Sequence, residues 1–321
     1  QSASGARDRS SPTQVPGKWN QVVGVNALSN KGIAFGWGHG GSGKLGVGDV
    51  VGRSSPTQVV GAGGFVELGG DRSSRRAVRG NGTLWAWGSN SAGILGQNSN
   101  QDFSSPVQIP GTTWSKPLIG GEDAAGCIKT DGTLWMWGNN QYGQLAQNNE
   151  GPSTQHSSPK QVPGTTWKDI AGTNDSYLAV KTDGTMWAWG NNEGVGGDGD
   201  ILPSIGTDRS SPIQIPGTTW NSISANSTQT IMATKTDGTL WTWGRGDGGS
   251  LGQNNEVKYS SPVQIPGTTW SSCGGGQSVL ATKTDNTLWA WGANGDGELG
   301  QNNTTQYSSP TQIPGTNWKQ G

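Results

Sequence analysis

The densest cluster of charged side chains in this sequence is a group of four arginines, Arg72, Arg75, Arg76 and Arg79. Guanidinium groups donate hydrogen bonds in a fixed fork, and that geometry suits phosphate, sulfate and carboxylate groups. The alternative is a solvated loop or strand face. We take the four arginines as candidate binding residues. If they bind a partner, replacing Arg75 and Arg76 with Ala should weaken that binding.

Two variable loops carry the second group of candidates. They cover residues 191–208 and 244–259, and they differ in length and sequence while the segments around them are nearly identical. Binding residues often lie on variable loops that a rigid scaffold holds in place. We therefore predict that binding involves side chains near the start of these loops, namely Asn191, Asn192, Glu193, Arg245 and Asp247.

Residues that could carry out catalysis are few. The only histidines, His39 and His156, lie in different segments, and no Ser or Asp partner pattern surrounds them. No Gly-rich phosphate loop follows a strand and opens a helix. Residues 197–200 and 294–298 resemble pieces of a calcium loop, but neither completes its pattern. We predict no enzymatic activity, no cofactor and no metal site.

The candidate residues are set into a repeated motif. The stretch Lys181–Gly190, with the sequence KTDGTMWAWG, returns almost unchanged at three other places. A looser copy covers Arg79–Gly88, and a more divergent copy covers Ser29–Gly38, where Phe35 replaces the first Trp. The close copies are Lys129–Gly138, Lys235–Gly244 and Lys283–Gly292.

Each copy of the motif predicts a β-hairpin. Asp183 and Gly184 stand between two β-prone runs, and an Asp-Gly pair favours a two-residue turn in which both residues have positive φ. In the second strand, Trp187 and Trp189 point to one face. The residues between them are also apolar and point to the other face. Both faces should therefore be covered, as in a central strand of stacked blades.

Two further segments complete a unit of four strands. A Ser-Ser-Pro segment, as in 157–164, predicts an outer edge strand because proline cannot donate to a ladder. The run Trp167–Ile170 predicts the innermost strand. The proline recurs with a spacing of about 50 residues, which is typical of the blades of a β-propeller. It stands at Pro12, Pro56, Pro106, Pro159, Pro212, Pro262 and Pro310.

The whole chain, residues 1–321, is predicted to form a single all-β propeller domain. There are seven outer strands but only six hairpins. We therefore expect seven-blade geometry, with a last blade that is incomplete and shared by the two ends; the alternative is six blades. The start at Gln1 fits a mature product or a fragment. The repeats run about 10–53, 54–103, 104–156, 157–209, 210–259, 260–307 and, in part, 308–321.

Composition limits the classes of function. Only 13% of the residues are charged, and the net charge of −1 gives no field that would attract nucleic acid. No apolar run is long enough to insert into a membrane. Cys127 and Cys273 fall on apolar strand positions and are expected to be buried free thiols. The weakly charged surface, rich in Asn, Gln, Ser and Thr, favours an extracellular, virion or surface-associated protein; a cytoplasmic one also fits.

The motif resembles the repeat of the regulator of chromosome condensation family. The shared pattern is a hairpin ending in Trp-Gly, then Asn-x-x-x-Gly-x-Leu-Gly, then a Pro-led strand, as in Trp85–Gly96 and Trp291–Gly300. The resemblance covers nearly the whole chain. It implies a seven-bladed propeller whose terminal blade is shared by both chain ends. Members include a nucleotide-exchange factor for a small GTPase that also binds chromatin, and a secreted bacterial inhibitor of β-lactamases.

This sequence also departs from the family pattern. The family commonly has a His before the hairpin, and residues 175–177 contain none. Residues 194–197 break the Gly-x-Leu-Gly element, and Ala146 ends it in the third unit. Neither activity therefore transfers residue by residue, since a fold does not imply a function.

The function that we predict from the sequence is a non-enzymatic binding or structural scaffold that acts through loops on a propeller face. The expected partner is a protein or a second copy of the chain, or else a surface glycan, and neither nucleic acid nor a membrane. An incomplete terminal blade would leave an edge open for strand addition. The alternatives are a specific inhibitor or regulatory partner of an enzyme or GTPase, and a lectin.

Overall fold

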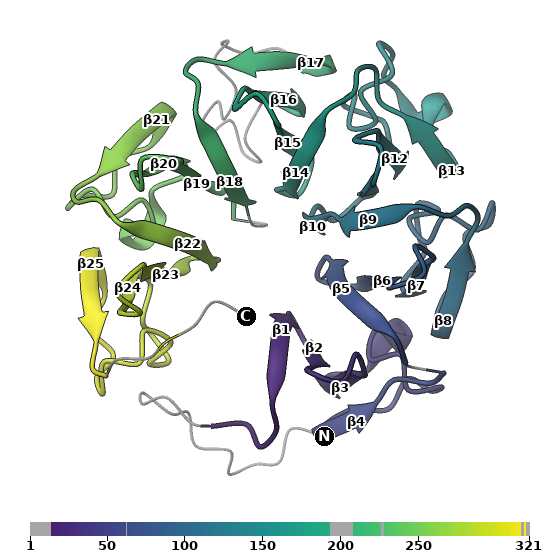
Figure 1. Ribbon diagram of the computed structural model, residues 1–321, viewed down its shortest axis with the longest axis horizontal. Helices are drawn as coiled ribbons and strands as arrows, with labels where there is room; N and C mark the ends of the chain where they lie inside the picture. Colours follow the sequence, from purple (N-terminus) through teal and green to yellow (C-terminus); the bar gives the residue numbers. More distant parts are fainter. Residues whose placement is uncertain (1–13, 62, 193–207, 226–227, 316–317, 319–321) are drawn as a thin grey trace.

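The computed structural model describes residues 14–61, 63–192, 208–225, 228–315 and 318. Within these residues, the strands form six groups of four antiparallel strands that stand around a central axis (Figure 1). Each group is a blade, and we number the blades one to six in chain order. The predicted all-β propeller is confirmed.

The strands of blade one are β1 (Trp19–Val23), β2 (Asn26–Ser29), β3 (Ala34–Gly38) and β4 (Arg53–Gln58), and those of blade two are β5 (Phe65–Gly70), β6 (Ser74–Arg79), β7 (Leu84–Gly88) and β8 (Phe103–Ile109). Blade three has β9 (Trp114–Pro117), β11 (Ala124–Lys129), β12 (Leu134–Gly138) and β13 (His156–Gln161), with β10 (Ile119–Gly120) beside it. Blade four has β14 (Trp167–Gly172), β15 (Ser176–Lys181), β16 (Met186–Gly190) and β17 (Arg209–Ile215). Blade five has β18 (Trp220–Ala225), β19 (Thr230–Lys235), β20 (Leu240–Gly244) and β21 (Tyr259–Ile265), and blade six has β22 (Trp270–Gly275), β23 (Ser278–Lys283), β24 (Leu288–Gly292) and β25 (Tyr307–Ile313). Three short 3₁₀ helices are η1 (Gly41–Gly43), η2 (Pro152–Thr154) and η3 (Asp247–Gly249).

Each blade runs from the axis to the rim in the order inner strand, two hairpin strands, outer strand. In blade four this order is β14, β15, β16 and β17, and Figure 1 shows β14 beside the axis and β17 at the rim. The predicted roles of the Trp-led and Pro-led segments are therefore confirmed. The short strand β10 pairs in parallel with both β5 and β14, so it joins blades two and four close to the axis.

The second Trp of a hairpin fills the space between neighbouring blades. The indole N–H of Trp189 donates to the carbonyl oxygen of Gln144 in the preceding blade at 2.8 Å. Trp291 makes the same bond to Ser250 at 2.9 Å. Ala188, on the other face of the strand, is also buried. Both faces of the strand are therefore covered, which explains why the motif is apolar at successive positions.

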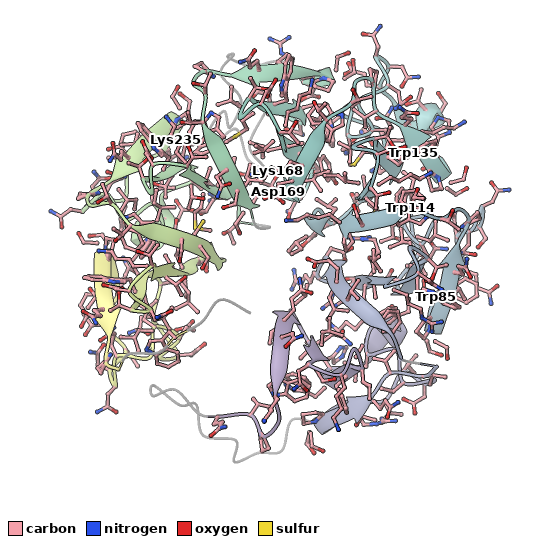
Figure 2. The ribbon with its side chains drawn as sticks, in the orientation of Figure 1. Trp85, Trp114, Trp135, Lys168, Asp169 and Lys235 are labelled. Carbon is pink, nitrogen blue, oxygen red and sulfur yellow. The ribbon has the colours of Figure 1, made fainter. Side chains whose placement is uncertain are left out.

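Polar side chains tie the inner strands of adjacent blades together. Lys116 Nζ lies 2.8 Å from a carboxylate oxygen of Asp169, which lies beside the axis (Figure 2). The other oxygen of Asp169 accepts a hydrogen bond from the Ile223 N–H at 3.1 Å. Burial opposes the charge on Lys116, but Asp169 and Glu67 together outweigh it and raise the pKa of the ammonium group. This contact therefore links blades three, four and five.

The hairpin turn differs from the predicted one. The Gly184 N–H donates to the Lys181 carbonyl at 3.0 Å, and the Lys181 N–H donates to the Thr185 carbonyl at 2.9 Å. Gly184 has a φ of 79°, whereas Asp183 is not among the residues with positive φ. The loop therefore has three residues with glycine at its end, which is the type I turn with a bulge. The Asp183 carboxylate accepts from the Thr185 N–H at 2.9 Å and from its hydroxyl at 2.7 Å, which stabilises this form.

Replacing Gly184 with Ala should destabilise the protein by roughly 1–3 kcal/mol. The backbone there is left-handed, and a Cβ would lie 2.9 Å from the backbone nitrogen of Thr219. The measurement is the free energy of unfolding in urea. Asn286→Gly is the control, because Asn286 already holds a φ of 63° at the equivalent position and glycine adopts it freely. Equal destabilisation by both changes would contradict this account of the turn.

The two cysteines are free thiols, as predicted. Cys127 is buried, as predicted, whereas Cys273 is only half-buried. Burial raises the pKa of the Cys127 thiol strongly and raises the pKa of Cys273 to about 12. Both thiols are therefore protonated at neutral pH, and neither has the thiolate that nucleophilic chemistry needs.

One sector of the ring, between blade six and blade one, contains no strand within the described residues (Figure 1). A side chain that borders it on blade six is exposed where its counterparts are covered. Leu280 is 41% exposed, whereas Leu178 at the same register position is 0% exposed and packs against the next blade. The side of blade six that faces this sector therefore exposes a large apolar side chain at a position that other blades bury against their neighbours.

Candidate functional site

The connections of each blade alternate between two faces of the ring, because successive strands are antiparallel. We call one side the turn face; it carries the hairpin turns, such as residues 181–185, and the links from outer strands to the next inner strands. We call the other side the loop face. It carries the links from inner strand to hairpin, such as 173–175, and from hairpin to outer strand, such as 245–258. Most of the candidates from the sequence lie on or near the loop face.

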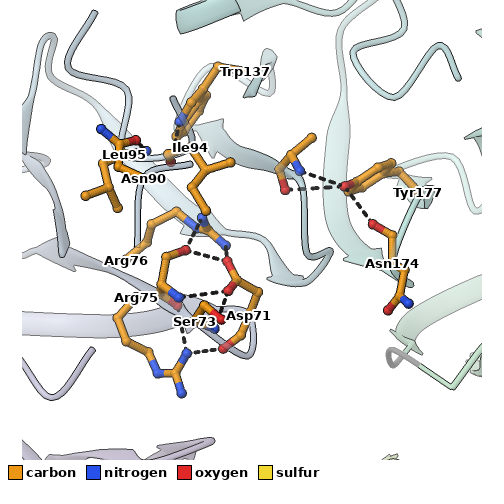
Figure 3. A network of polar contacts seen from close by, with 12 residues as sticks. Asp71, Ser73, Arg75, Arg76, Asn90, Ile94, Leu95, Trp137, Asn174 and Tyr177 are labelled. Atoms are coloured by element: carbon orange, nitrogen blue, oxygen red, sulfur yellow. Dashed lines mark hydrogen bonds and ion pairs between the residues drawn. The ribbon is translucent and has the colours of Figure 1, made fainter. Parts of the chain in front are cut away.

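Arg75 and Arg76 are used inside the protein, so the prediction that they contact a partner is corrected. Arg75 is 2% exposed and Arg76 is 0% exposed. Arg76 forms an ion pair with Asp71 at 3.3 Å. Arg75 donates to the carbonyls of Asp71 and Ser74 (Figure 3). It also donates to the side chain of Asn26 in blade one at 3.1 Å. Burial lowers the pKa of Arg75 to about 10, so it stays charged at neutral pH.

Arg72 and Arg79, the other two arginines of the cluster, lie on opposite sides of the ring. Arg72 is exposed on the loop face. Arg79 lies toward the turn face, where its guanidinium carbon is 5.1 Å from the Phe65 ring centroid and 4.2 Å from that of Trp85. It also donates to the carbonyl of Gly61 at 2.7 Å. The four arginines therefore do not form one anion site, and Arg72 alone is available on the loop face.

The stacking of Arg79 belongs to an arrangement that recurs in blades two to six, which we call the cation clamp. In blade four, Lys181 Nζ lies 4.7 Å from the ring centroids of both Trp167 and Trp187. The Trp187 N–H donates to the Thr185 hydroxyl at 3.0 Å, which fixes the ring. The recurrence of Lys with Trp in the motif indicates this contact, which was not among the contacts predicted from the sequence. The same clamp holds Lys129, Lys235 and Lys283.

The candidates at the start of the first variable loop are mostly covered. Asn191 is half-buried and Asn192 is buried, with its backbone N–H donating to Asp208 at 3.0 Å. Glu193 lies outside the described residues. The equivalent residue in blade two shows the role of such an asparagine, because the Asn90 side chain accepts from the Leu95 N–H at 2.8 Å (Figure 3). Asn192 is therefore not offered to a partner.

Arg245 and Asp247 lie together at a small cavity on the loop face. Their side chains form an ion pair at 2.7 Å. The cavity has a volume of about 190 Å³, and Asn174, Gln229 and Gln277 also line it. Gln229 is 6% exposed and has a φ of 61°, a conformation that costs free energy for a residue other than glycine. The cavity therefore joins residues from blades four, five and six.

Among the described residues, two amide oxygens at this cavity have no hydrogen-bond partner. They are Oδ1 of Asn174 and Oε1 of Gln229, and both atoms are buried. A buried acceptor without a donor costs roughly 1–3 kcal/mol. A ligand that brings N–H or O–H donors would remove that cost, so the cavity is suited to bind a donor group. Neither residue could be predicted from the sequence, because neither belongs to the repeated motif.

Carboxylates gather on the loop face of blades three and four. Glu122, Asp123 and Asp175 are each half-buried. Burial raises the pKa of Asp175, and the negative charges of Asp123, Glu122 and Asp208 raise it further. Burial also raises the pKa of Glu122, with Arg72 opposing the shift. The negative potential here favours a positively charged group on a partner.

The described residues contain no group of three or more His, Cys, Asp or Glu side chains placed to hold a metal ion. Residues 294–298, one of the two incomplete calcium-like segments, are organised by the bond from the Asp296 N–H to Glu298 at 2.9 Å. The other, residues 197–200, lies outside the described part of the chain. No helix within the described residues has the length and apolar character needed to cross a membrane.

Repeated four-stranded blades, packed through tryptophans and joined by variable loops, define the chain as a repeat β-propeller. A family model of the regulator of chromosome condensation (RCC1) repeat matches residues 81–116, 131–180, 237–281 and 285–320, which together make up more than half of the chain. The protein therefore belongs to the RCC1 repeat family. A comparison with curated protein sequences gives no match.

Solved structures share this fold at low sequence identity. Yeast RCC1 (Prp20), solved bound to Kap60, has a TM-score of 0.76 and 20% identity, covering 92% of this chain and 74% of its own. A second structure, of Prp20p from Saccharomyces cerevisiae, has a TM-score of 0.76 and 20% identity, covering 92% of this chain and 76% of its own. Human WBSCR16 has a TM-score of 0.77 and 18% identity, covering 94% of this chain and 84% of its own.

Proposed function

We propose that this protein is a regulatory binding propeller whose loop face holds a protein partner. The main support is that this face carries polar groups without hydrogen-bond partners among the described residues, and carboxylates that repel one another. Asn174 and Gln229 hold buried amide oxygens without donors, and Glu122, Asp123 and Asp175 repel one another nearby. Donors and positive charge from a partner would relieve both costs.

One propeller among the solved structures with this fold has been studied with protein partners. Yeast Prp20 has been solved bound to Kap60, and its second structure was reported with its binding properties to Gsp1p and histones. At 20% identity this likeness extends only to the fold, so a partner for the present chain is argued from its own residues. Its acidic loop face suits a partner with a basic patch, such as a basic regulatory surface of an enzyme or GTPase.

The test is capture of a protein partner by the immobilised full chain from an extract of its source, followed by measurement of the dissociation constant with the purified partner. Asp123→Lys combined with Asp175→Lys should weaken binding about tenfold or more, because like charges across an interface cost several kcal/mol. The matched control is Thr165→Lys combined with Thr218→Lys, which adds lysines at exposed positions of the turn face. Equal weakening by both pairs, or by neither, would refute the loop face as the binding surface.

Partner binding should weaken as the pH falls from 7 to about 5. Burial and neighbouring charges raise the pKa of Glu122 and Asp175, so both carboxyls take up protons at a higher pH than ordinary ones. Their charge, and with it the attraction for a basic partner, is lost at a higher pH than the charge of ordinary carboxyls. The measurement is the dissociation constant against pH. Glu122→Gln with Asp175→Asn should bind more weakly at pH 7 and show a flatter profile; an unchanged profile would contradict the assignment.

We also propose that the ring has seven-blade geometry, with the seventh position next to blade one, rather than six blades. Trp318 supports this. Its backbone N–H donates to the Asn286 carbonyl at 3.1 Å, as the backbone N–H of Trp270 does to the Gly238 carbonyl at 2.9 Å. Trp318 also packs against blade six. It therefore occupies the place where an inner strand begins. An experimental structure with blade one packed directly on blade six would refute the seven-blade geometry.

Location, self-assembly, glycan binding and the absence of enzymatic activity stay predictions from the sequence. An extracellular, virion or surface position would be tested by fractionation of the source. Sizing of the protein at several concentrations would test self-assembly, and a glycan array would test the lectin alternative. A single soluble partner in constant stoichiometry would favour the regulator over the scaffold.

A further inference from the structure

Blade one lacks the cation of the clamp that blades two to six contain. In blade four, the residue that pairs with Trp167 across the inner strands is Lys181. In blade one, the residue that pairs with Trp19 is Ser29. Its side chain is too short to reach the ring faces, and its hydroxyl accepts from the Ile33 N–H at 3.1 Å instead. The position of the lysine ammonium is therefore not filled by the equivalent residue.

The aromatic walls of the clamp remain in blade one. The ring centroids of Trp19 and Phe35 are 5.3 Å apart and nearly perpendicular, at 83°. The ring centroid of Trp37 lies 5.9 Å from that of Trp19. All three residues line a cavity of about 1050 Å³ that also includes Ser29. In the described part of the chain, no Lys or Arg stands over Trp19 or Phe35.

We propose that this cavity binds the ammonium group of a lysine side chain carried by a protein partner. The chain itself supplies the precedent, because in four blades a lysine Nζ occupies the equivalent place between two rings, for example 4.6 Å from Trp220 and 4.3 Å from Trp241. The negative faces of aromatic rings attract such a cation. In the occupied clamps the inner-strand ring is buried and the hairpin ring is half-buried, as Trp167 and Trp187 are in blade four.

The charges that face the cavity set the conditions for binding. Lys18 and Lys31 line it, and both are exposed. Lys31 stands where other copies of the motif have Asp or Asn, so it repels an incoming ammonium group. Asn81 in blade two, where Arg79 occupies the clamp, indicates that a carboxylate at this position is not required. Added salt screens exposed charges, so binding should strengthen with salt and after Lys31→Asp.

The experiment titrates Nα-acetyl-lysine amide into the full chain and follows the indole N–H signals by NMR. Nα-acetyl-norleucine amide, which has a similar apolar stem and no charge, is the comparison probe. The lysine probe should shift the Trp19 and Trp37 signals and bind about tenfold more tightly than the norleucine probe. Equal affinity of the two probes, or tighter binding of Nα-acetyl-arginine amide, would overturn the assignment to lysine.

Two variants make the test specific to the clamp. Ser29→Lys supplies the missing cation from within and should abolish binding of the lysine probe. Lys181→Ser empties an occupied clamp and should create a second site whose probe shifts the Trp167 signal. Binding that survives Ser29→Lys in a folded protein would overturn the proposal. The cavity lies on the flank of blade one and not on the loop face, so this proposal and the proposed function can fail separately.

Discussion

Replacing Arg76 with Ala is expected to destabilise the protein by about 3–5 kcal/mol. Its side chain is 0% exposed and pairs with Asp71, whose side chain is 2% exposed. Removing the guanidinium leaves a carboxylate buried without its ionic partner, and a cavity in the blade. The measurement is the free energy of unfolding in guanidinium chloride. A loss below about 1 kcal/mol would mean that the ion pair contributes only as much as a surface pair.

Two control variants separate the charge from the packing. Arg72→Ala should change stability by less than about 0.5 kcal/mol, because Arg72 is exposed on the loop face. Arg76→Met combined with Asp71→Asn should recover most of the loss, since it removes both charges and keeps a large side chain. Met232 occupies the equivalent position in blade five and is fully buried. If the double variant is no more stable than Arg76→Ala, neither the unpaired charge nor the lost side-chain volume accounts for the effect.

Replacing Trp189 with Ala is expected to cost about 3–5 kcal/mol. The side chain is fully buried between blades three and four, and its N–H donates to the Gln144 carbonyl. The variant loses apolar burial and leaves that carbonyl without its indole donor. Thermal and denaturant unfolding measure the effect. A small loss would mean that the blades stack without the help of this residue.

Trp37 provides a matched control at the same position in blade one. It is half-buried, and because its counterpart Trp189 faces the preceding blade, Trp37 faces the sector that precedes blade one. Trp37→Ala should therefore cost clearly less than Trp189→Ala, because less apolar surface is lost from the interior. If the two changes cost the same, Trp37 is covered in solution by a further part of the chain or by a partner.

The strands could be predicted from the sequence because each one is repeated with the same pattern. The hairpin of blade four, the inner strand from Trp167 and the Pro-led outer strand are all found where the periodicity placed them. The turn was misjudged at Asp183, because the carboxylate bonds to Thr185 favour a three-residue loop that the Asp-Gly pair alone does not reveal. Local hydrogen bonding therefore determines the length of the hairpin loop, which the repeated pattern alone does not.

The candidate site was harder to predict because it depends on residues brought together from different blades. Arg75 and Arg76 were grouped with exposed arginines, since proximity in sequence does not show that a charge is paired inside a strand. The cavity of Asn174 and Gln229 lies between blades, and these two residues are 55 positions apart in the chain. The cation clamps were readable in principle, because a lysine opens each close copy of the motif.

The most direct test of the loop face is hydrogen–deuterium exchange of the full chain with and without its captured partner. We predict slower exchange at residues 121–124, 173–176 and 228–230, and no change at the hairpin turn around residues 181–185. Each of these loop-face segments contains half-buried residues that the partner would cover. Protection confined to the turn face, with unchanged exchange at all three loop-face segments, would contradict the proposed function.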